Sequence, residues 1–154
     1  MNLDIQAALD LPDETDAFLQ ISDILFEKHS AVGYDGLTQS EKVFYCIDGF
    51  VRGMGNGGIS QFFYDEAGVH ASDAVLAFEA VKAGKIKQLL EQALACFPDT
   101  SIPADDDARD DLVSSLEENY SEEWSAMTDV FFQNEAELIK ATLAYVGKNL
   151  KNFS

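Results

Sequence analysis

The chain has 154 residues, of which 47% are hydrophobic and 11% aromatic, and its formal net charge at pH 7 is −18. This length suits one compact domain, and the aromatic content excludes the disordered acidic class, whose members are poor in aromatic residues. So large a negative charge repels nucleic acid and anionic membranes and attracts cationic surfaces, so direct binding of DNA or RNA is not expected.

The start of the chain, MNLDIQAALDLPDET, has no basic segment followed by a long apolar run, so no secretion signal is predicted. No stretch approaches the roughly 18 apolar residues that a membrane span needs. Cys46 and Cys96 both stand among apolar neighbours, as buried free thiols commonly do. We therefore expect a cytoplasmic protein without disulfides and without a membrane interaction.

The first third of the chain shows the apolar spacing of helices. Residues 3–9 form a short amphipathic segment, and a second helix is predicted from about residue 13 to residue 29, followed by a loop, SAVGYDGL. Thr38 and Glu41 have the spacing of a capping box, which opens a third helix. The apolar residues that follow, as far as Met54, fit a period of 3.6 residues and not the alternation of a strand.

The remaining segments also read as helices. GMGNGG, at residues 53–58, breaks the third helix, and ISQFFYDEAG is predicted as a short helix or turn. Two further helices, over residues 71–83 and 85–97, are joined at Gly84 and closed by Pro98. An acidic region covers about residues 104–137 and is helical to about residue 132, and a C-terminal helix is predicted over residues 135–150. Since few segments alternate as strands do, the prediction is an all-α fold, a single compact multi-helix domain over residues 1–154.

The sequence contains only incomplete matches to known catalytic and metal-binding motifs. GMGNGG satisfies G-x-G-x-x-G, but that motif binds a dinucleotide only where a strand feeds a helix, and here a helix precedes it. His29 and His70 lack zinc spacing. A calcium loop starting at Asp105 fails, because Arg109 and Asp110 stand where an oxygen ligand and a glycine are needed. No catalytic residue, metal ion or cofactor is predicted, and an enzyme is the less favoured class.

The acidic region contains twelve carboxylates and one base, Arg109, between residues 105 and 137. On a helix, its apolar residues from Val113 to Phe131 form a narrow stripe, as a core-facing helix requires. The opposite, solvent face of that helix carries Asp107, Asp111, Glu118 and Glu122. A break near Asn119 or Ser121, both good N-caps, would instead divide the region into two helices.

Two interpretations of these carboxylates compete. Acids after Pro103 would stabilise the start of a helix, and the others would be an ordinary solvated face. Alternatively they form a partner-binding surface, because like charges four residues apart repel and about one charge per 3 Å of helix approaches the phosphate spacing of a DNA strand. The candidate partner-binding residues are Asp105, Asp106, Asp107, Asp110, Asp111, Glu117, Glu118, Glu122 and Glu123.

Four segments resemble the DNA-mimic family of small acidic bacterial proteins: NGGISQFF at residues 56–63, ALACFP at 93–98, WSAMTDVFF at 124–132 and LAYVGKN at 143–149. That family carries the signature N-G-G-x-x-Q-[FY]-F, and the similarity extends over about residues 41–153. The resemblance implies an all-helical fold, often a homodimer, and an acidic surface that occupies the DNA-binding face of a transcription regulator. The chain departs from the family in having RGMG before the signature and VKAGK between the middle helices.

The signature also has a physical interpretation. Gly57 and Gly58 allow a tight turn, Asn56 caps the following helix, and Gln61 hydrogen-bonds the turn. Phe62 and Phe63 pack the segment onto the core, so these six residues are expected to form a structural corner, with a binding site as the lesser alternative.

The preferred hypothesis is therefore a non-enzymatic acidic protein that binds a basic DNA-binding protein, such as a transcription regulator, through its carboxylates. One alternative is an immunity protein that neutralises a basic nuclease toxin. A second is a small hydrolase that uses a carboxylate in a cleft near Asn56 and Gln61.

Overall fold

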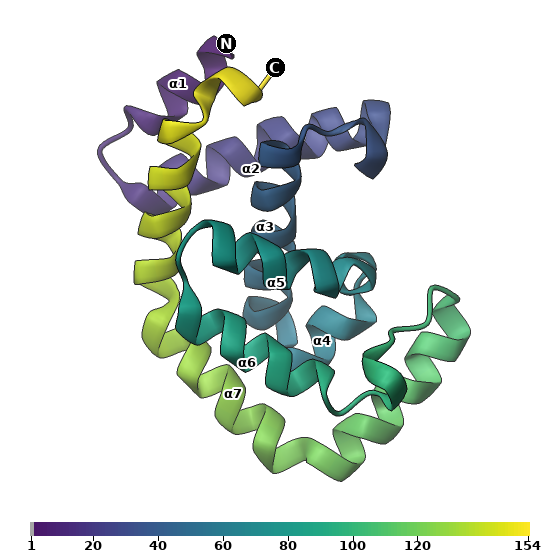
Figure 1. Cartoon of the computed structure of the whole chain (residues 1–154). Coiled ribbons are helices and arrows are strands. Elements are labelled where there is room, and N and C mark those ends of the chain that lie inside the picture. Colours follow the sequence, from purple (N-terminus) through teal and green to yellow (C-terminus); the bar gives the residue numbers. More distant parts are fainter. Residues whose placement is uncertain (1) are drawn as a thin grey trace.

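A computed structural model describes residues 2–154, and every regular element in that range is a helix, as predicted. The α-helices are α1 (Leu3–Leu9), α2 (Glu14–Val32), α3 (Gln39–Gly57), α4 (Ile59–Tyr64), α5 (Ala71–Ala80), α6 (Gly84–Leu94) and α7 (Asp106–Lys148). Four short 3-10 helices connect or follow them: η1 (Tyr34–Gly36), η2 (Glu66–His70), η3 (Pro98–Thr100) and η4 (Leu150–Asn152). Figure 1 shows α3 in the middle of the bundle and α7 wrapped around its outside.

Phe50, on the inner face of α3, is the centre of the core. Its ring packs edge-on against Phe62 of α4 at 4.9 Å, Phe78 of α5 at 5.1 Å and Phe131 of α7 at 5.5 Å between centroids. All four rings are fully buried, and burial of such a side chain stabilises a fold by about 1.5–3 kcal/mol. One aromatic cluster thus joins four helices that are far apart in the sequence.

The long helix α7 contains the acidic region and the predicted C-terminal helix in one element. The prediction of two helices that separate near residues 132–135 is wrong, because no glycine or proline interrupts this stretch and the buried stripe continues through Phe131, Leu138 and Val146. The alternative of a break near Asn119 or Ser121 is confirmed as a kink: Tyr120 has non-helical angles, φ −122° and ψ 24°. Residues 106–119 are called the first arm and residues 121–148 the second arm, and the direction of the helix changes sharply between them (Figure 1).

Several other helix ends differ from the predicted boundaries. The second helix continues to Val32, and Gly33, with φ 73°, ends it. The third helix runs through the glycines to Gly57 and stops only at Gly58, whose φ is 89°. Lys82, with φ 64°, and not Gly84, makes the turn between α5 and α6. In each case the helix ends where the backbone leaves the right-handed region, and isolated glycines inside a helix did not end it.

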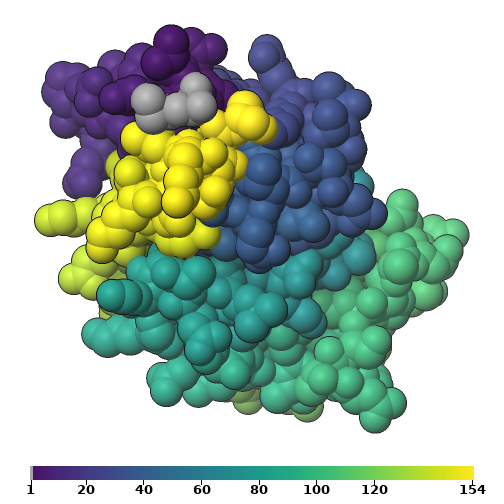
Figure 2. Space-filling view, turned by 45° about the horizontal axis from the view of Figure 1, so that its top comes forward, coloured from purple at the N-terminus to yellow at the C-terminus, as the bar shows by residue number. Residues whose placement is uncertain are grey.

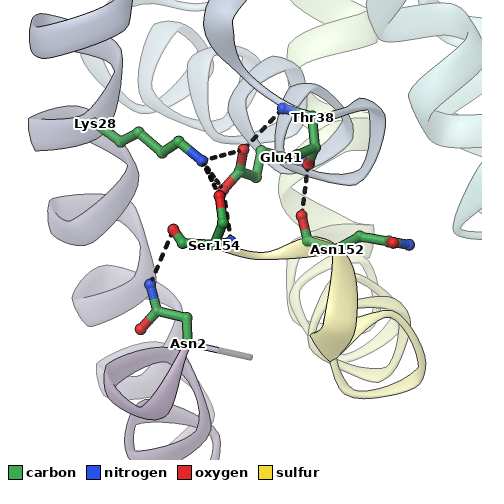
Figure 3. Close-up of polar contacts among 6 residues, drawn as sticks. All are labelled: Asn2, Lys28, Thr38, Glu41, Asn152 and Ser154. Carbon is green, nitrogen blue, oxygen red and sulfur yellow. Dashed lines mark hydrogen bonds and ion pairs between the residues drawn. The ribbon is translucent and has the colours of Figure 1, made fainter.

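The predicted capping box at the start of α3 is present and forms part of a larger closure. Glu41 Oε1 accepts the Thr38 backbone N–H at 2.8 Å, and Thr38 Oγ1 accepts the Glu41 N–H at 3.2 Å. Lys28 Nζ from α2 pairs with both Glu41 oxygens at 2.7 Å, and the Ser154 N–H donates to Glu41 Oε2 at 3.2 Å (Figure 3). Glu41 is fully buried, so one carboxylate holds together α2, α3 and the segment after η4.

The same closure brings the two ends of the described chain side by side. Asn2 caps α1 through its side-chain oxygen, and its Nδ2 donates to the Ser154 carbonyl at 3.3 Å. In Figure 2 the N-terminal and C-terminal segments share one face, whereas the first arm of α7 forms the right and lower-right margin of the molecule. Within residues 2–154, no helix combines the length and the apolar character that crossing a bilayer requires.

Candidate acidic interface

The nine candidate partner-binding residues are all exposed and lie within one continuous segment of the fold. Asp105 is the N-cap of α7, and its side chain accepts the Ala108 N–H at 2.9 Å. Asp106, Asp107, Asp110, Asp111, Glu117 and Glu118 lie on the first arm, and Glu122 and Glu123 lie just beyond the kink. These nine residues are called the acidic array.

The kink divides the solvent face that a straight helix would have. Asp107, Asp111 and Glu118 remain on one side of the first arm, whereas Glu122 belongs to the second arm, which runs in another direction. From Asp105 to Glu118 the helix is about 20 Å long, at about 1.5 Å per residue. Seven carboxylates over this length give about one charge per 3 Å, which is close to the phosphate spacing of one DNA strand, about 3.4 Å.

Arg109, the one base in this region, faces inward. Its side chain is 4% exposed; Nη1 donates to the carbonyl oxygens of Pro103 at 3.4 Å and Ala104 at 3.2 Å, and Nη2 donates to Asp106 Oδ1 at 2.7 Å. Asp106 remains 84% exposed despite this pair. Arg109 therefore fixes the loop before α7 and does not cover the array. Its spacing to Val113, four residues later on the apolar stripe, is a sequence signal that it faces the core.

Basic residues do not compensate the rest of the array. The ion pairs in residues 2–154 are Lys28–Glu41, Arg52–Asp48, Lys87–Glu79 and Arg109–Asp106, and only the last involves a member of the array. Lys82 and Lys85 lie instead beside the second arm, where they line a cavity of about 340 Å³ with Glu137. These two lysines therefore lie apart from the array.

The N-G-G-x-x-Q-F-F segment is the corner between α3 and α4, and it contacts α7 directly. A Cβ on Gly58 would lie 2.8 Å from Thr128 Oγ1, and the Ile59 N–H donates to the same hydroxyl at 3.3 Å. Thr128 of the second arm therefore provides the cap that was predicted for Asn56, which is exposed in the last turn of α3. Gln61 Nε2 donates to Asp65 Oδ1 at 2.8 Å and not to the turn.

The two phenylalanines of the corner hold the second arm in place. Both are fully buried, and the Phe63 ring lies 5.6 Å from Trp124 and 4.7 Å from Phe97 between centroids. Because Trp124 is only four residues past the kink, the corner fixes α7 next to the point where its direction changes. Hydrogen bonding and aromatic packing at this corner thereby hold the start of the second arm, to which the first arm with most of the acidic array is joined.

A cluster of four rings was not predicted from the sequence. His29 stacks on Tyr45 at 4.6 Å, and Tyr34 stacks on His70 at 3.8 Å, so both histidines join α2, η1, α3 and η2. The Tyr34 hydroxyl donates to Asp73 at 2.7 Å. Burial lowers the pKa of His70 and, with that hydrogen bond, raises the pKa of Tyr34. Residues so far apart in the sequence carry no local signal that they meet.

No group of three or more histidine, cysteine or acidic side chains in residues 2–154 is arranged to hold a metal ion. Cys46 and Cys96 are unpaired. Burial raises the pKa of the Cys46 thiol to about 11, which disfavours the thiolate that metal binding and nucleophilic attack require.

The described residues form an all-helical fold in which nine exposed carboxylates, only one of them paired with a base, lie along one kinked helix and its N-cap. A model of the DMP19-like protein family matches residues 35–149, well over half of the chain, including the α3–α4 corner and all of α7. The chain therefore belongs to the DMP19-like family of DNA-mimic proteins. No curated protein and no solved structure matches it significantly.

Proposed function

We propose that this protein binds the DNA-binding surface of a basic protein, such as a transcription regulator, by presenting the acidic array in place of DNA phosphates. The observation that carries this proposal is the exposure of all nine carboxylates on one segment in which the single base is buried. Membership of a DNA-mimic family supports the same mode of action. The protein acts by binding and requires no catalytic step.

In such a complex, electrostatic complementarity raises the association rate and favours basic partners over others. Complementary charged surfaces steer association, and this contribution falls as salt shortens the screening length. A helix that carries about one charge per 3 Å offers lysine and arginine side chains a row of acceptors at the spacing of phosphates. A partner selected in this way must therefore release double-stranded DNA when it binds this protein.

The array is tested by changing four carboxylates without changing their size: Asp107→Asn, Asp111→Asn, Glu118→Gln and Glu122→Gln. Immobilised parent protein is expected to capture a DNA-binding protein from an extract of its own cells at low salt, and to lose it at high salt or when duplex DNA is added. The four-acid variant is expected to capture none of it. The matched control removes the same charge from exposed acids elsewhere, Asp4, Asp10, Asp35 and Glu91, and should capture as the parent does.

Two outcomes would contradict this proposal. Equal capture by the parent and the four-acid variant would show that the array is not the binding surface. Capture of a nuclease that duplex DNA cannot displace would favour the immunity-protein alternative instead.

The hydrolase alternative gains no specific support from the structure. Asp48 is an acid whose pKa is raised by burial, and its oxygens accept hydrogen bonds from Ser22 Oγ at 2.7 Å and Arg52 Nε at 3.3 Å. The Ser22 hydrogen bond joins α2 to α3, and Asp48 lines a different cavity from the one at Gly57. These hydrogen bonds indicate that Asp48 has a structural role at the contact between the two helices.

A further inference from the structure

A cavity of about 310 Å³ lies at the kink of α7, between the α3–α4 corner and the two arms. Glu117 of the first arm and Asp129 of the second arm both line it, together with Gly57, the last residue of α3. This volume is near the lower end of the range of ligand pockets, about 300–1,000 Å³, and suits one side chain. It is called the bend cavity.

The bend cavity favours a cation. Its lining contains two exposed carboxylates and no basic residue. The last turn of α3 also lacks a basic residue, so the partial negative charge at that helix end is uncompensated by its own side chains. Ser60, Ser121 and Ser125 add three hydroxyl groups that make no side-chain hydrogen bond within residues 2–154.

An independent feature of the cavity points to a ligand that also carries an acceptor. Trp124 lines the cavity and is 3% exposed, yet its Nε1–H has no hydrogen-bond partner. Buried indole N–H groups normally have an acceptor. The nearby Thr128 hydroxyl donates to the Trp124 carbonyl at 2.9 Å and accepts the Ile59 N–H at 3.3 Å, and it makes no hydrogen bond to the indole.

We propose that the bend cavity receives an arginine side chain of the partner, with its guanidinium between Glu117 and Asp129 and a carbonyl of the same peptide segment accepting the Trp124 N–H. A guanidinium has five donors in a planar fork, which matches two carboxylates and several hydroxyls better than a compact ammonium does. This inference rests on the proposed function for the source of the arginine. It adds one specific pocket to the array of exposed charges.

The pocket can be tested without the partner, because Trp124 is the only tryptophan of the chain. The ¹⁵N-labelled protein therefore gives a single indole N–H resonance. We expect this resonance to shift saturably as N-acetyl-L-argininamide is added at constant ionic strength, and not to shift with the neutral isostere N-acetyl-L-citrullinamide. Absence of a shift, or equal shifts with both compounds, would overturn the inference. A shift with free L-arginine but none with the blocked amide would assign the pocket to a free amino acid and would equally overturn it.

Variants that remove equal charge distinguish binding in the bend cavity from a general effect of negative charge. Glu117→Gln with Asp129→Asn should weaken binding of the arginine amide at least about tenfold, as loss of a charged partner does. Asp35→Asn with Glu91→Gln removes the same charge from exposed acids outside both the cavity and the array and should change the affinity less than about twofold. Equal weakening by both pairs would show only a general effect of charge and would contradict the pocket. The four-acid variant leaves the bend cavity intact, so loss of capture by that variant and loss of the indole shift are separate outcomes.

Discussion

At the scale of single residues, Glu41 makes more of the fold's polar contacts than any acid of the array. It is fully buried, pairs with Lys28 and accepts backbone N–H groups from Thr38 and Ser154. Glu41→Gln keeps the shape but removes the charge and one acceptor oxygen. Because Lys28 remains 21% exposed, we expect the free energy of unfolding to fall by about 2–3 kcal/mol, below the range for a fully buried pair. Urea denaturation measures this loss.

Glu79→Gln is the control for that prediction. Glu79 is 62% exposed and lies 3.5 Å from Lys87, and exposed pairs of this kind contribute about 0–1 kcal/mol. Equal losses in the two variants would show that burial does not distinguish these carboxylates.

At the scale of elements, the α3–α4 corner depends on the backbone of Gly58. Its angles, φ 89° and ψ −160°, lie in a region that only glycine adopts readily, and an added Cβ would meet Thr128. Gly58→Ala is therefore expected to lower the free energy of unfolding by about 2–3 kcal/mol. It should also move the Trp124 fluorescence, because Thr128 and Trp124 are hydrogen-bonded neighbours on the second arm.

Gly55→Ala serves as the matched substitution. Gly55 lies inside α3, and an added Cβ would meet nothing within 4 Å. This change should raise the free energy of unfolding by about 0.5–1 kcal/mol, since alanine favours a helix. Destabilisation of similar size in both variants would contradict the strain assigned to Gly58.

The helices were largely predictable from the sequence, and their ends were not. Capping chemistry is local, so the Thr38–Glu41 box and the first helix could be predicted from neighbouring residues. Gly55 and Gly84 do not end helices, whereas Lys82 adopts a positive φ, because packing between helices decides where the chain turns. The bend at Tyr120 was an alternative that the N-cap residues Asn119 and Ser121 indicated, whereas the direction of the first arm depends on how α7 packs against the rest of the fold.

At the scale of the whole molecule, net charge opposes stability. Most of the 28 carboxylates have no basic partner in residues 2–154, so their mutual repulsion destabilises the compact state. Raising the salt from about 0.01 M to about 0.1 M shortens the Debye length from about 30 Å to about 10 Å. We expect the free energy of unfolding to rise over this range, as measured by urea denaturation at each salt concentration.

The four-acid variant should be more stable than the parent at low salt and should respond less to added salt. It would then combine greater stability with lost capture, which separates a defect in binding from a defect in folding. Stability that falls as salt is added would show that attractive pairs dominate and would contradict this account.

Some features of the candidate site could be predicted from the sequence because they depend on local spacing, and others could not because they depend on tertiary packing. Exposure of the array follows from its position opposite the apolar stripe, and the sequence alone indicated it. The inward direction of Arg109 could be inferred from its spacing to Val113 on the apolar stripe. The placement of Glu117 and Asp129 on one cavity depends on tertiary packing. The stack of His29, Tyr34, Tyr45 and His70 joins segments about 40 residues apart and could not be inferred from spacing.

The continuity of α7 has a mechanical consequence. The helix that carries the carboxylates is the same one whose far portion is seated in the core through Phe131, Leu138 and Val146, and its near portion is itself seated through Val113. A helix that is packed on the core on both sides of its kink does not move when a partner contacts its exposed face. For the proposed complex, we therefore expect the protein to act as a rigid template and the partner to make the conformational adjustment.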